Sequence, residues 1–132
     1  MSHTIINPPP ILVHPTTGPY NHALEIQPDL RWVVVSGQVP LAPDGTIPEG
    51  IEAQTKLVWQ NLIHILAEAG MDMTDVVKLT HYVTGREHLE GYNRARAEFM
   101  GDVKPASTLL LISGLARPEF LVEVDLMAAK AP

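Results

Sequence analysis

Two acidic residues interrupt an apolar segment near the end of the chain, which reads Leu-Val-Glu-Val-Asp-Leu at 121–126. Because side chains alternate between the two faces of a strand, Glu123 and Asp125 lie on one face, and Val122 and Val124 lie on the other. An acid in such a strand either faces solvent or takes part in chemistry. A carboxyl group in a cleft can orient water and transfer protons. Alternation leaves both interpretations open for Glu123, and Asp125, one step further along the same face, is interpreted as structural.

The composition excludes several other kinds of site. The 132 residues include no cysteine, which excludes a thiolate nucleophile, a disulfide and a cysteine-ligated metal. The six histidines show no metal-ligand spacing, so no metal site is expected. The formal net charge of -6, with 9 basic against 15 acidic residues, argues against nucleic acid as a partner.

The sequence also indicates where in the cell the protein is expected. No apolar run is long enough to span a membrane, and the N-terminus lacks the basic start of a secretory signal. We therefore expect a cytoplasmic protein with no membrane partner.

Apolar periodicity and chain breakers predict one domain over residues 1–132. A proline-dense extended segment covers 7–15, and a breaker-rich loop covers 40–50. Strands are predicted at 23–27, 31–36, 76–84, 105–112 and 121–128, and helices at 51–69 and 86–100. The first two strands are expected to form an antiparallel hairpin, and the last two to be joined by a short loop.

The resulting order, β-β-α-β-α-β-β, is typical of an α+β fold with a single sheet and both helices on one of its faces. The other face of the sheet would then expose a large apolar area to water. Association between copies of the chain is therefore the physical expectation. Trp32 and Trp59 are both interpreted as packing anchors.

Motifs spread over nearly the whole chain resemble the reactive intermediate deaminase family, also called Rid or YjgF. They are Gly-Pro-Tyr at 18–20, Ser-Gly-Gln at 36–38, Tyr-Asn at 92–93, Pro-Ala-Ser-Thr at 105–108 and Leu-Val-Glu-Val at 121–124. The resemblance implies a chorismate-mutase-like fold that assembles as a homotrimer, with clefts for small-molecule ligands between subunits. It implies no metal and no cofactor.

The resemblance also implies roles for particular residues. Glu123 would orient a water molecule, and Tyr20 would offer a hydroxyl group in the cleft. The implied ligand-binding positions are Ser36, Gly37, Asn93, Ser107, Thr108 and Leu109.

Ser107 is the main departure from the family pattern. Most proteins shown to be deaminases in the family carry an arginine there, which holds a substrate carboxylate. Serine has neither the charge nor the reach, and loss of such a bond weakens carboxylate binding about tenfold to a hundredfold. The change favours an uncharged ligand over a 2-imino acid, unless Arg117, Arg86 or Arg96 is brought into the site by the fold or by a neighbouring subunit.

Two histidines have alternative interpretations. His22 follows Tyr20 by two residues, where it is either an acid or base near neutral pH or a partly exposed strand residue, the simpler interpretation. His81 shares a strand face with Val77, Leu79 and Val83, so it is predicted to be a core or interface residue.

The leading functional hypothesis is hydrolysis of a small reactive imine or enamine, with doubtful activity on 2-imino acids. The alternative is a non-catalytic protein that binds a small metabolite, or a hydrolase of another small molecule, on the same trimeric scaffold. A ribonuclease is the least favoured hypothesis because the chain is acidic and has no basic run.

Overall fold

The computed structural model describes residues 3–9 and 18–132. Its strands are β1 (His3–Ile6), β2 (Ala23–Ile26), β3 (Arg31–Gln38), β4 (Val76–Val83), β5 (Ala106–Leu111) and β6 (Val122–Lys130). Its α-helices are α1 (Ile51–Glu68) and α2 (Leu89–Met100), and short 3-10 turns at Met73–Asp75 and Arg86–His88 precede β4 and α2. The extended segment predicted over 7–15 lies outside the described residues from residue 10 onward.

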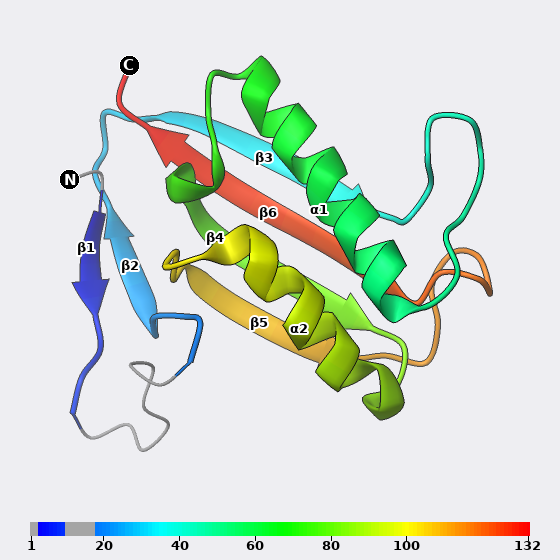
Figure 1. The fold of residues 1–132 in the computed structure, drawn as a ribbon. Helices are drawn as coiled ribbons and strands as arrows, with labels where there is room; N and C mark the ends of the chain where they lie inside the picture. The colour runs from blue at the N-terminus through cyan, green and yellow to red at the C-terminus, as the bar shows by residue number, and fades with distance from the viewer. Residues whose placement is uncertain (1–2, 10–17) are drawn as a thin grey trace.

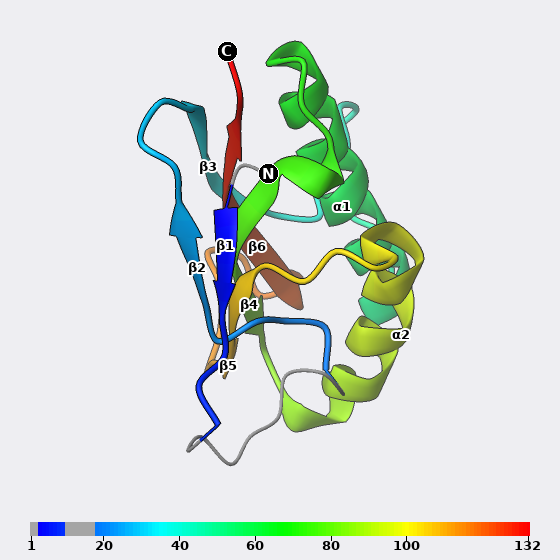
Figure 2. The same ribbon diagram turned by 90° about the vertical axis from the view of Figure 1, so that its left-hand side faces the viewer.

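Four strands form the main sheet in the order β3-β6-β4-β5, in which β4 and β5 are parallel and the other neighbours are antiparallel. Figures 1 and 2 show α1 and α2 side by side on one face of this sheet. The predicted α+β class, with two helices on one face of a sheet, is therefore confirmed. The edge strands of the main sheet are β3 on one side and β5 on the other.

Both helices form and end where their sequences predict. In α1 the buried positions Val58, Leu62 and Leu66 recur at four-residue steps and face the sheet. The helix stops before Gly70, whose φ of 69° is a left-handed conformation that favours glycine. Gly101, with φ 54°, follows α2 in the same way. The first turn predicted for α2 is the 3-10 turn Arg86–His88.

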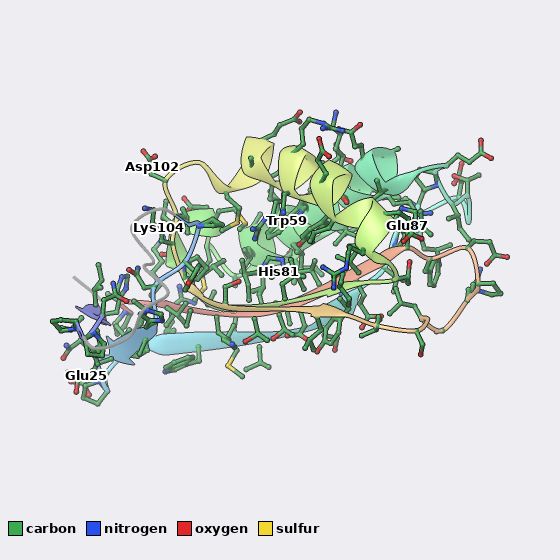
Figure 3. All side chains as sticks on the ribbon, turned by 90° about the horizontal axis from the view of Figure 1, so that it is seen from below. Glu25, Trp59, His81, Glu87, Asp102 and Lys104 are labelled. Atoms are coloured by element: carbon green, nitrogen blue, oxygen red, sulfur yellow. The ribbon has the colours of Figure 1, made fainter. Side chains whose placement is uncertain are left out.

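The hydrophobic core lies between the helices and the sheet. Trp59 of α1 and Tyr92 of α2 are fully buried there against Leu79, Val124 and Leu126 from β4 and β6. Figure 3 shows Trp59 and His81 in this layer. The packing role predicted for Trp59 is confirmed, and the core prediction for His81 is confirmed by its zero exposure.

The predicted pairing of the first two strands is wrong. Strand β2 pairs with β1 in a separate two-stranded ladder, and β3 pairs with β6 instead of β2. The reason is that β3 has a core face, with Val33 and Val35 packed against the helices, and therefore joins the main sheet. Strands β5 and β6, for which the sequence predicts only a short connecting loop, are not neighbours, because β4 lies between them. The connection at 112–121 is long enough to pass this central strand.

The face of the sheet away from the helices carries an exposed apolar patch, formed by Trp32 and Val34 of β3, Leu110 of β5 and Met127 of β6. Val34 is 72% exposed and Trp32 is 47% exposed. Trp32 is thus not a packing anchor within one copy of the chain, because its position in the strand alternation directs it away from the core. We call these four residues the open-face patch.

Candidate functional site

The residues predicted for the site fall into two groups on opposite faces of the sheet. Glu123 lies on the open face of β6, whereas Ser107 of β5 points to the helix side, where it contacts buried His81. Because the strand β4 separates β5 from β6, one copy of the chain does not bring the two residues together.

The first group surrounds Glu123 and consists of Gly37, Tyr82, Glu123 and Asp125. The ladder between β3 and β6 is irregular between Val35 and Gln38, and Gly37 lies in this irregular stretch. The Glu123 carboxylate occupies the space beside Gly37 that a side chain would fill, since a Cβ built on Gly37 would overlap its Oε2 and lie 2.7 Å from its Cδ. We call these four residues the Glu123 group, and Ser36 is exposed next to it.

The electrostatics of the Glu123 group favour the protonated form of Glu123. Burial raises the pKa of Glu123, and the negative charge of Asp125 raises it further. The Tyr82 hydroxyl donates a 2.9 Å hydrogen bond to the Asp125 carboxylate, and this bond is the main reason why the pKa of Tyr82 is raised. Asp125 is therefore held in place by Tyr82.

The second group surrounds Ser107 and consists of His81, Tyr92, Arg96 and Ser107. Nε2 of His81 lies 2.8 Å from the Ser107 hydroxyl, and Nδ1 of His81 contacts the Tyr92 hydroxyl. Burial, with the positive charges of Arg96 and Lys78, lowers the pKa of His81 to about 3, so its ring is neutral at pH 7. We call these four residues the Ser107 group.

Of the three candidate arginines, Arg96 lies in the Ser107 group. Its Nη1 is 3.4 Å from His81 Nε2, and its guanidinium lies over the Tyr92 ring, 5.6 Å from the centroid. Arg86 is exposed beside α2, and Arg117 stacks over Phe120 in the loop before β6. The helical spacing of Tyr92 and Arg96, four residues apart, is the sequence signal that they share a face.

The segment around Tyr20 lies against the start of β5. Asn21 forms a bridge with Ala106, its backbone N–H donates to the carbonyl of Pro105 at 3.0 Å, and its side chain donates to the carbonyl of Lys104 at 2.7 Å. Tyr20 and His22 flank it, with ring centroids 5.7 Å apart. Both are therefore near the strand that carries Ser107. Asn21 is buried and holds both residues in place. Nothing in the sequence indicates this role except its position between Tyr20 and His22.

The remaining predicted positions belong to neither group. Thr108 lies on the open face, where its hydroxyl accepts a 2.9 Å hydrogen bond from Lys78. Leu109 packs against the core, and Asn93 is exposed on α2. Within one copy, these three residues do not converge with Glu123.

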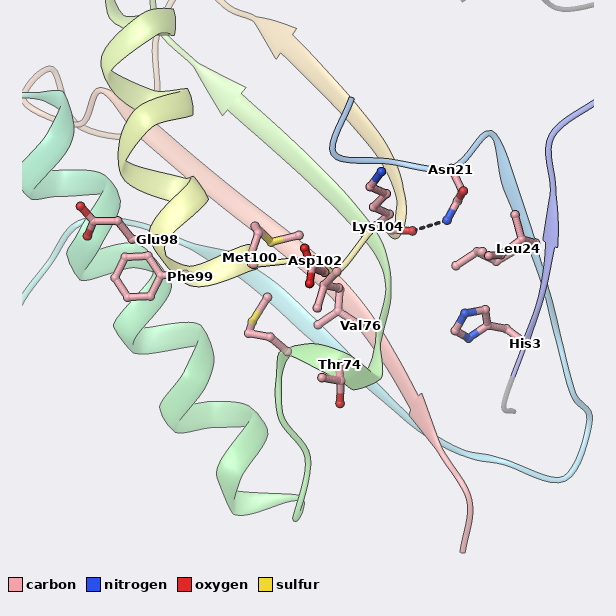
Figure 4. Close-up of a pocket in the computed structure, with 14 residues that line it drawn as sticks. His3, Asn21, Leu24, Thr74, Val76, Glu98, Phe99, Met100, Asp102 and Lys104 are labelled. Atoms are coloured by element: carbon pink, nitrogen blue, oxygen red, sulfur yellow. Dashed lines mark hydrogen bonds between the residues drawn. The ribbon is translucent and has the colours of Figure 1, made fainter. Parts of the chain in front are cut away.

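A hollow of about 690 Å³ lies elsewhere, between the β1-β2 ladder and the end of α2 (Figure 4). Leu24, Phe99 and Val103 are among its lining residues, and none of the predicted site residues lines it. In the described part of the chain no three potential ligands cluster to hold a metal. Neither helix described is both long and apolar enough to cross a membrane.

Comparisons with known proteins agree with this fold. The family model described as Endoribonuclease L-PSP matches residues 12–130. A RutC family protein of Pyrococcus abyssi is 36% identical over 115 residues, which cover 86% of this chain and 87% of that protein. The chain therefore belongs to the Rid (YjgF) family and has its chorismate-mutase-like fold.

Solved structures extend the likeness over nearly the full length. A protein of unknown function of the conserved Rid family from Yersinia pestis is 30% identical with a TM-score of 0.84, covering 98% of this chain and all of that one. A structure from Thermotoga maritima, described as a putative endoribonuclease, is 32% identical with a TM-score of 0.72, covering 87% of this chain and 89% of that one.

Proposed function

We propose that the protein hydrolyses small reactive imines or enamines, as a homotrimer whose clefts lie between copies of the chain. The observation that carries the proposal is the position of Glu123: a carboxyl group with a raised pKa that occupies the space beside Gly37 where a side chain would otherwise lie. Membership of the Rid family, the reactive intermediate deaminases that the chain's motifs resemble, is in keeping with the same reaction class without specifying the substrate.

The arrangement of the two groups favours a cleft between copies. They lie on opposite faces of the sheet, the Glu123 group toward the β3 edge and the Ser107 group at the β5 edge. When copies pack through the open-face patch, the Glu123 group of one copy can face the β5 edge of the next. Burial of the exposed Trp32 and Val34 would supply the driving force.

The chemistry requires one acid and one water. Water adds its oxygen to the carbon of the C=N bond while nitrogen receives a proton, and the resulting carbinolamine forms C=O and releases ammonia. In our proposal the Glu123 carboxylate orients the water, takes a proton from it as the oxygen adds to carbon, and passes this proton to the imine nitrogen. It then takes the O–H proton of the carbinolamine and passes it to the nitrogen as the C–N bond breaks. Positioning is the main contribution because small imines also hydrolyse in water without an enzyme.

RNA cleavage is the alternative suggested by the endoribonuclease wording attached to the family and to the T. maritima structure. The net charge of -6 disfavours it, because binding to RNA depends on neutralising phosphates with Lys and Arg. A small neutral or singly charged ligand does not require such a surface.

The test is an imine-trapping assay. An amino acid oxidase generates the imine in situ, semicarbazide traps what survives, and wild type is compared with Glu123→Gln. The matched control is Glu119→Gln, because Glu119 is exposed in the loop before β6. We expect wild type and Glu119→Gln to reduce trapping and Glu123→Gln not to. If wild type leaves trapping unchanged with several imines, the hydrolase proposal is overturned in favour of a small-metabolite binding protein.

A further inference from the structure

The hollow between the β1-β2 ladder and the end of α2 has the size of a small-molecule site. Its volume of about 690 Å³ lies within the roughly 300–1,000 Å³ that is usual for such pockets. One wall is the ladder, and the other is formed by the end of α2 and by the start of β4 with the 3-10 turn before it (Figure 4). No residue of the Glu123 group or of the Ser107 group lines the hollow. It is therefore separate from the proposed cleft.

The β1-β2 ladder presents an apolar face to this hollow. Ile5 and Leu24 lie directly opposite each other in the ladder, so their side chains share a face, and both line the hollow. Ile5 is 50% exposed and Leu24 is half-buried, and neither belongs to the buried core. A two-stranded ladder is only marginally stable by itself, and apolar surface left in water does not stabilise it. A ligand between the two walls would bury this face.

The opposite wall is also apolar, and it can adapt to a ligand. Met73, Val76 and Met100 are buried there, and Phe99 is partly buried. Methionine side chains change shape easily, and their sulfur atoms make favourable contacts with aromatic rings. Aromatic rings also pack favourably against one another. A wall that combines Phe99 with two methionines therefore favours a planar aromatic molecule.

Asn21 supplies a polar group at the edge of the hollow. It is 9% exposed, and its amide nitrogen carries two hydrogens, one of which it donates to the carbonyl of Lys104 at 2.7 Å. Its Oδ1 accepts a 2.8 Å hydrogen bond from Asn7. Among the described residues, nothing accepts the second amide hydrogen. Because a buried N–H without an acceptor is costly, a ligand that carries an acceptor is favoured here.

The charges at the edge of the hollow disfavour an anion. Glu98 and Asp102 both line it and are both exposed. Lys104 is the one lysine or arginine among the lining residues that the structure describes. Since two carboxylates outnumber one ammonium group, a negatively charged ligand would meet net repulsion.

We propose that this hollow is a second ligand site, which binds a small uncharged molecule with a planar aromatic ring and a hydrogen-bond acceptor. The ring packs between Ile5 and Leu24 of the ladder and Phe99 of α2, and the acceptor bonds to the second amide hydrogen of Asn21. The site lies outside the proposed cleft, so it does not depend on imine hydrolysis.

The test is a fluorescence titration with 6-propionyl-2-dimethylaminonaphthalene, an uncharged aromatic ketone whose emission moves to shorter wavelength in apolar surroundings. Wild type is compared with Ile5→Glu and with the matched control Ile6→Glu. Ile6 is 44% exposed on the same strand, and alternation directs it to the opposite face of the ladder. We expect Ile5→Glu to weaken binding by about tenfold or more, because it places a carboxylate against the ring. Ile6→Glu, and Val34→Glu in the open-face patch, should bind as wild type does.

Two analogues of the probe test the chemistry of the site. In 6-dimethylaminonaphthalene-2-sulfonate an anion replaces the ketone, and 2-dimethylaminonaphthalene has neither group. Both should bind wild type more weakly than the ketone, the first through repulsion and the second through loss of the acceptor for Asn21. Tighter binding of the sulfonate would contradict a site for uncharged ligands.

NMR spectra of wild type with labelled methionine methyl groups locate the probe without any variant, so the test stands even if Ile5→Glu fails to fold. Met73 and Met100 line the hollow, whereas Met127 lies in the open-face patch. We expect the probe to shift the methyl signals of Met73 and Met100 and to leave that of Met127 in place. A shift of Met127 alone, unchanged affinity in folded Ile5→Glu, or no binding to wild type at micromolar concentration would each overturn the proposal.

Discussion

Gly37 and the carboxylate of Glu123 occupy neighbouring positions that leave no room for a side chain on residue 37. A Cβ on Gly37 would overlap Oε2 of Glu123 and lie 2.7 Å from its Cδ. The backbone at Gly37 does not have a positive φ, so alanine is permitted there conformationally. The glycine is therefore required by the space that Glu123 occupies.

Gly37→Ala should displace the Glu123 carboxylate and lower kcat/KM for imine hydrolysis by about a hundredfold, the size of effect expected from a misplaced catalytic group. Stability should change little, because the clash falls on the end of a flexible side chain. Gly114→Ala is the matched control, since a Cβ there meets no atom within 4 Å. Full activity in Gly37→Ala would show that the position of Glu123 does not matter.

Asp125→Asn should shift the pH dependence of activity. The charge of Asp125 helps to raise the pKa of Glu123, so its removal lowers that pKa. In our account Glu123 acts as a carboxylate, and activity is lost as pH falls through its pKa. The acidic limb of kcat/KM against pH should therefore move to lower pH in Asp125→Asn and stay unmoved in Asp102→Asn, whose residue is exposed after α2. A limb that moves to higher pH would contradict this assignment.

The buried, neutral His81 should make stability pH-dependent. Its pKa in the folded protein is about 3, against an ordinary value of 6.5, so the unfolded chain binds more protons between these values and stability falls as pH falls. At 1.36 kcal/mol per pH unit, the His81 contribution amounts to about 2 kcal/mol between pH 7 and pH 5.

Urea unfolding of His81→Gln at the two pH values checks this prediction. The difference in unfolding free energy between pH 7 and pH 5 should be smaller than in wild type by about that amount. His64→Asn, at an exposed position of α1, should retain the wild-type pH dependence. An identical pH dependence in His81→Gln and wild type would mean that His81 is not held neutral.

Val34→Glu should weaken assembly. Val34 is the most exposed residue of the open-face patch, and burying a carboxylate there between copies would carry a large desolvation cost. Analytical ultracentrifugation should show Val34→Glu shifted toward the monomer. Gln60→Glu, on the exposed side of α1, should assemble as wild type does. Unchanged assembly of Val34→Glu would place the interface elsewhere.

Alternation and helical periodicity were sufficient to predict the elements that carry the site. They placed Glu123 opposite Val122 and Val124, put His81 on the core face of its strand, and located α1. They did not predict which strands pair, because β1 has no distinctive pattern and competition between partners is decided by the whole sheet. They also did not predict the contact of Arg96 with His81, because it depends on how α2 packs over β4 and periodicity treats these two elements separately.

The most direct test of the account is whether imine hydrolysis belongs to the assembled protein. Size-exclusion chromatography with light scattering gives the number of chains in each fraction, and the semicarbazide assay is run on the same fractions at micromolar concentration. Our account predicts that activity elutes with a species of three chains, and that the monomer obtained with Val34→Glu is inactive because Glu123 and Ser107 lie on opposite faces of one sheet. A stable, fully active wild-type monomer would contradict the cleft between copies.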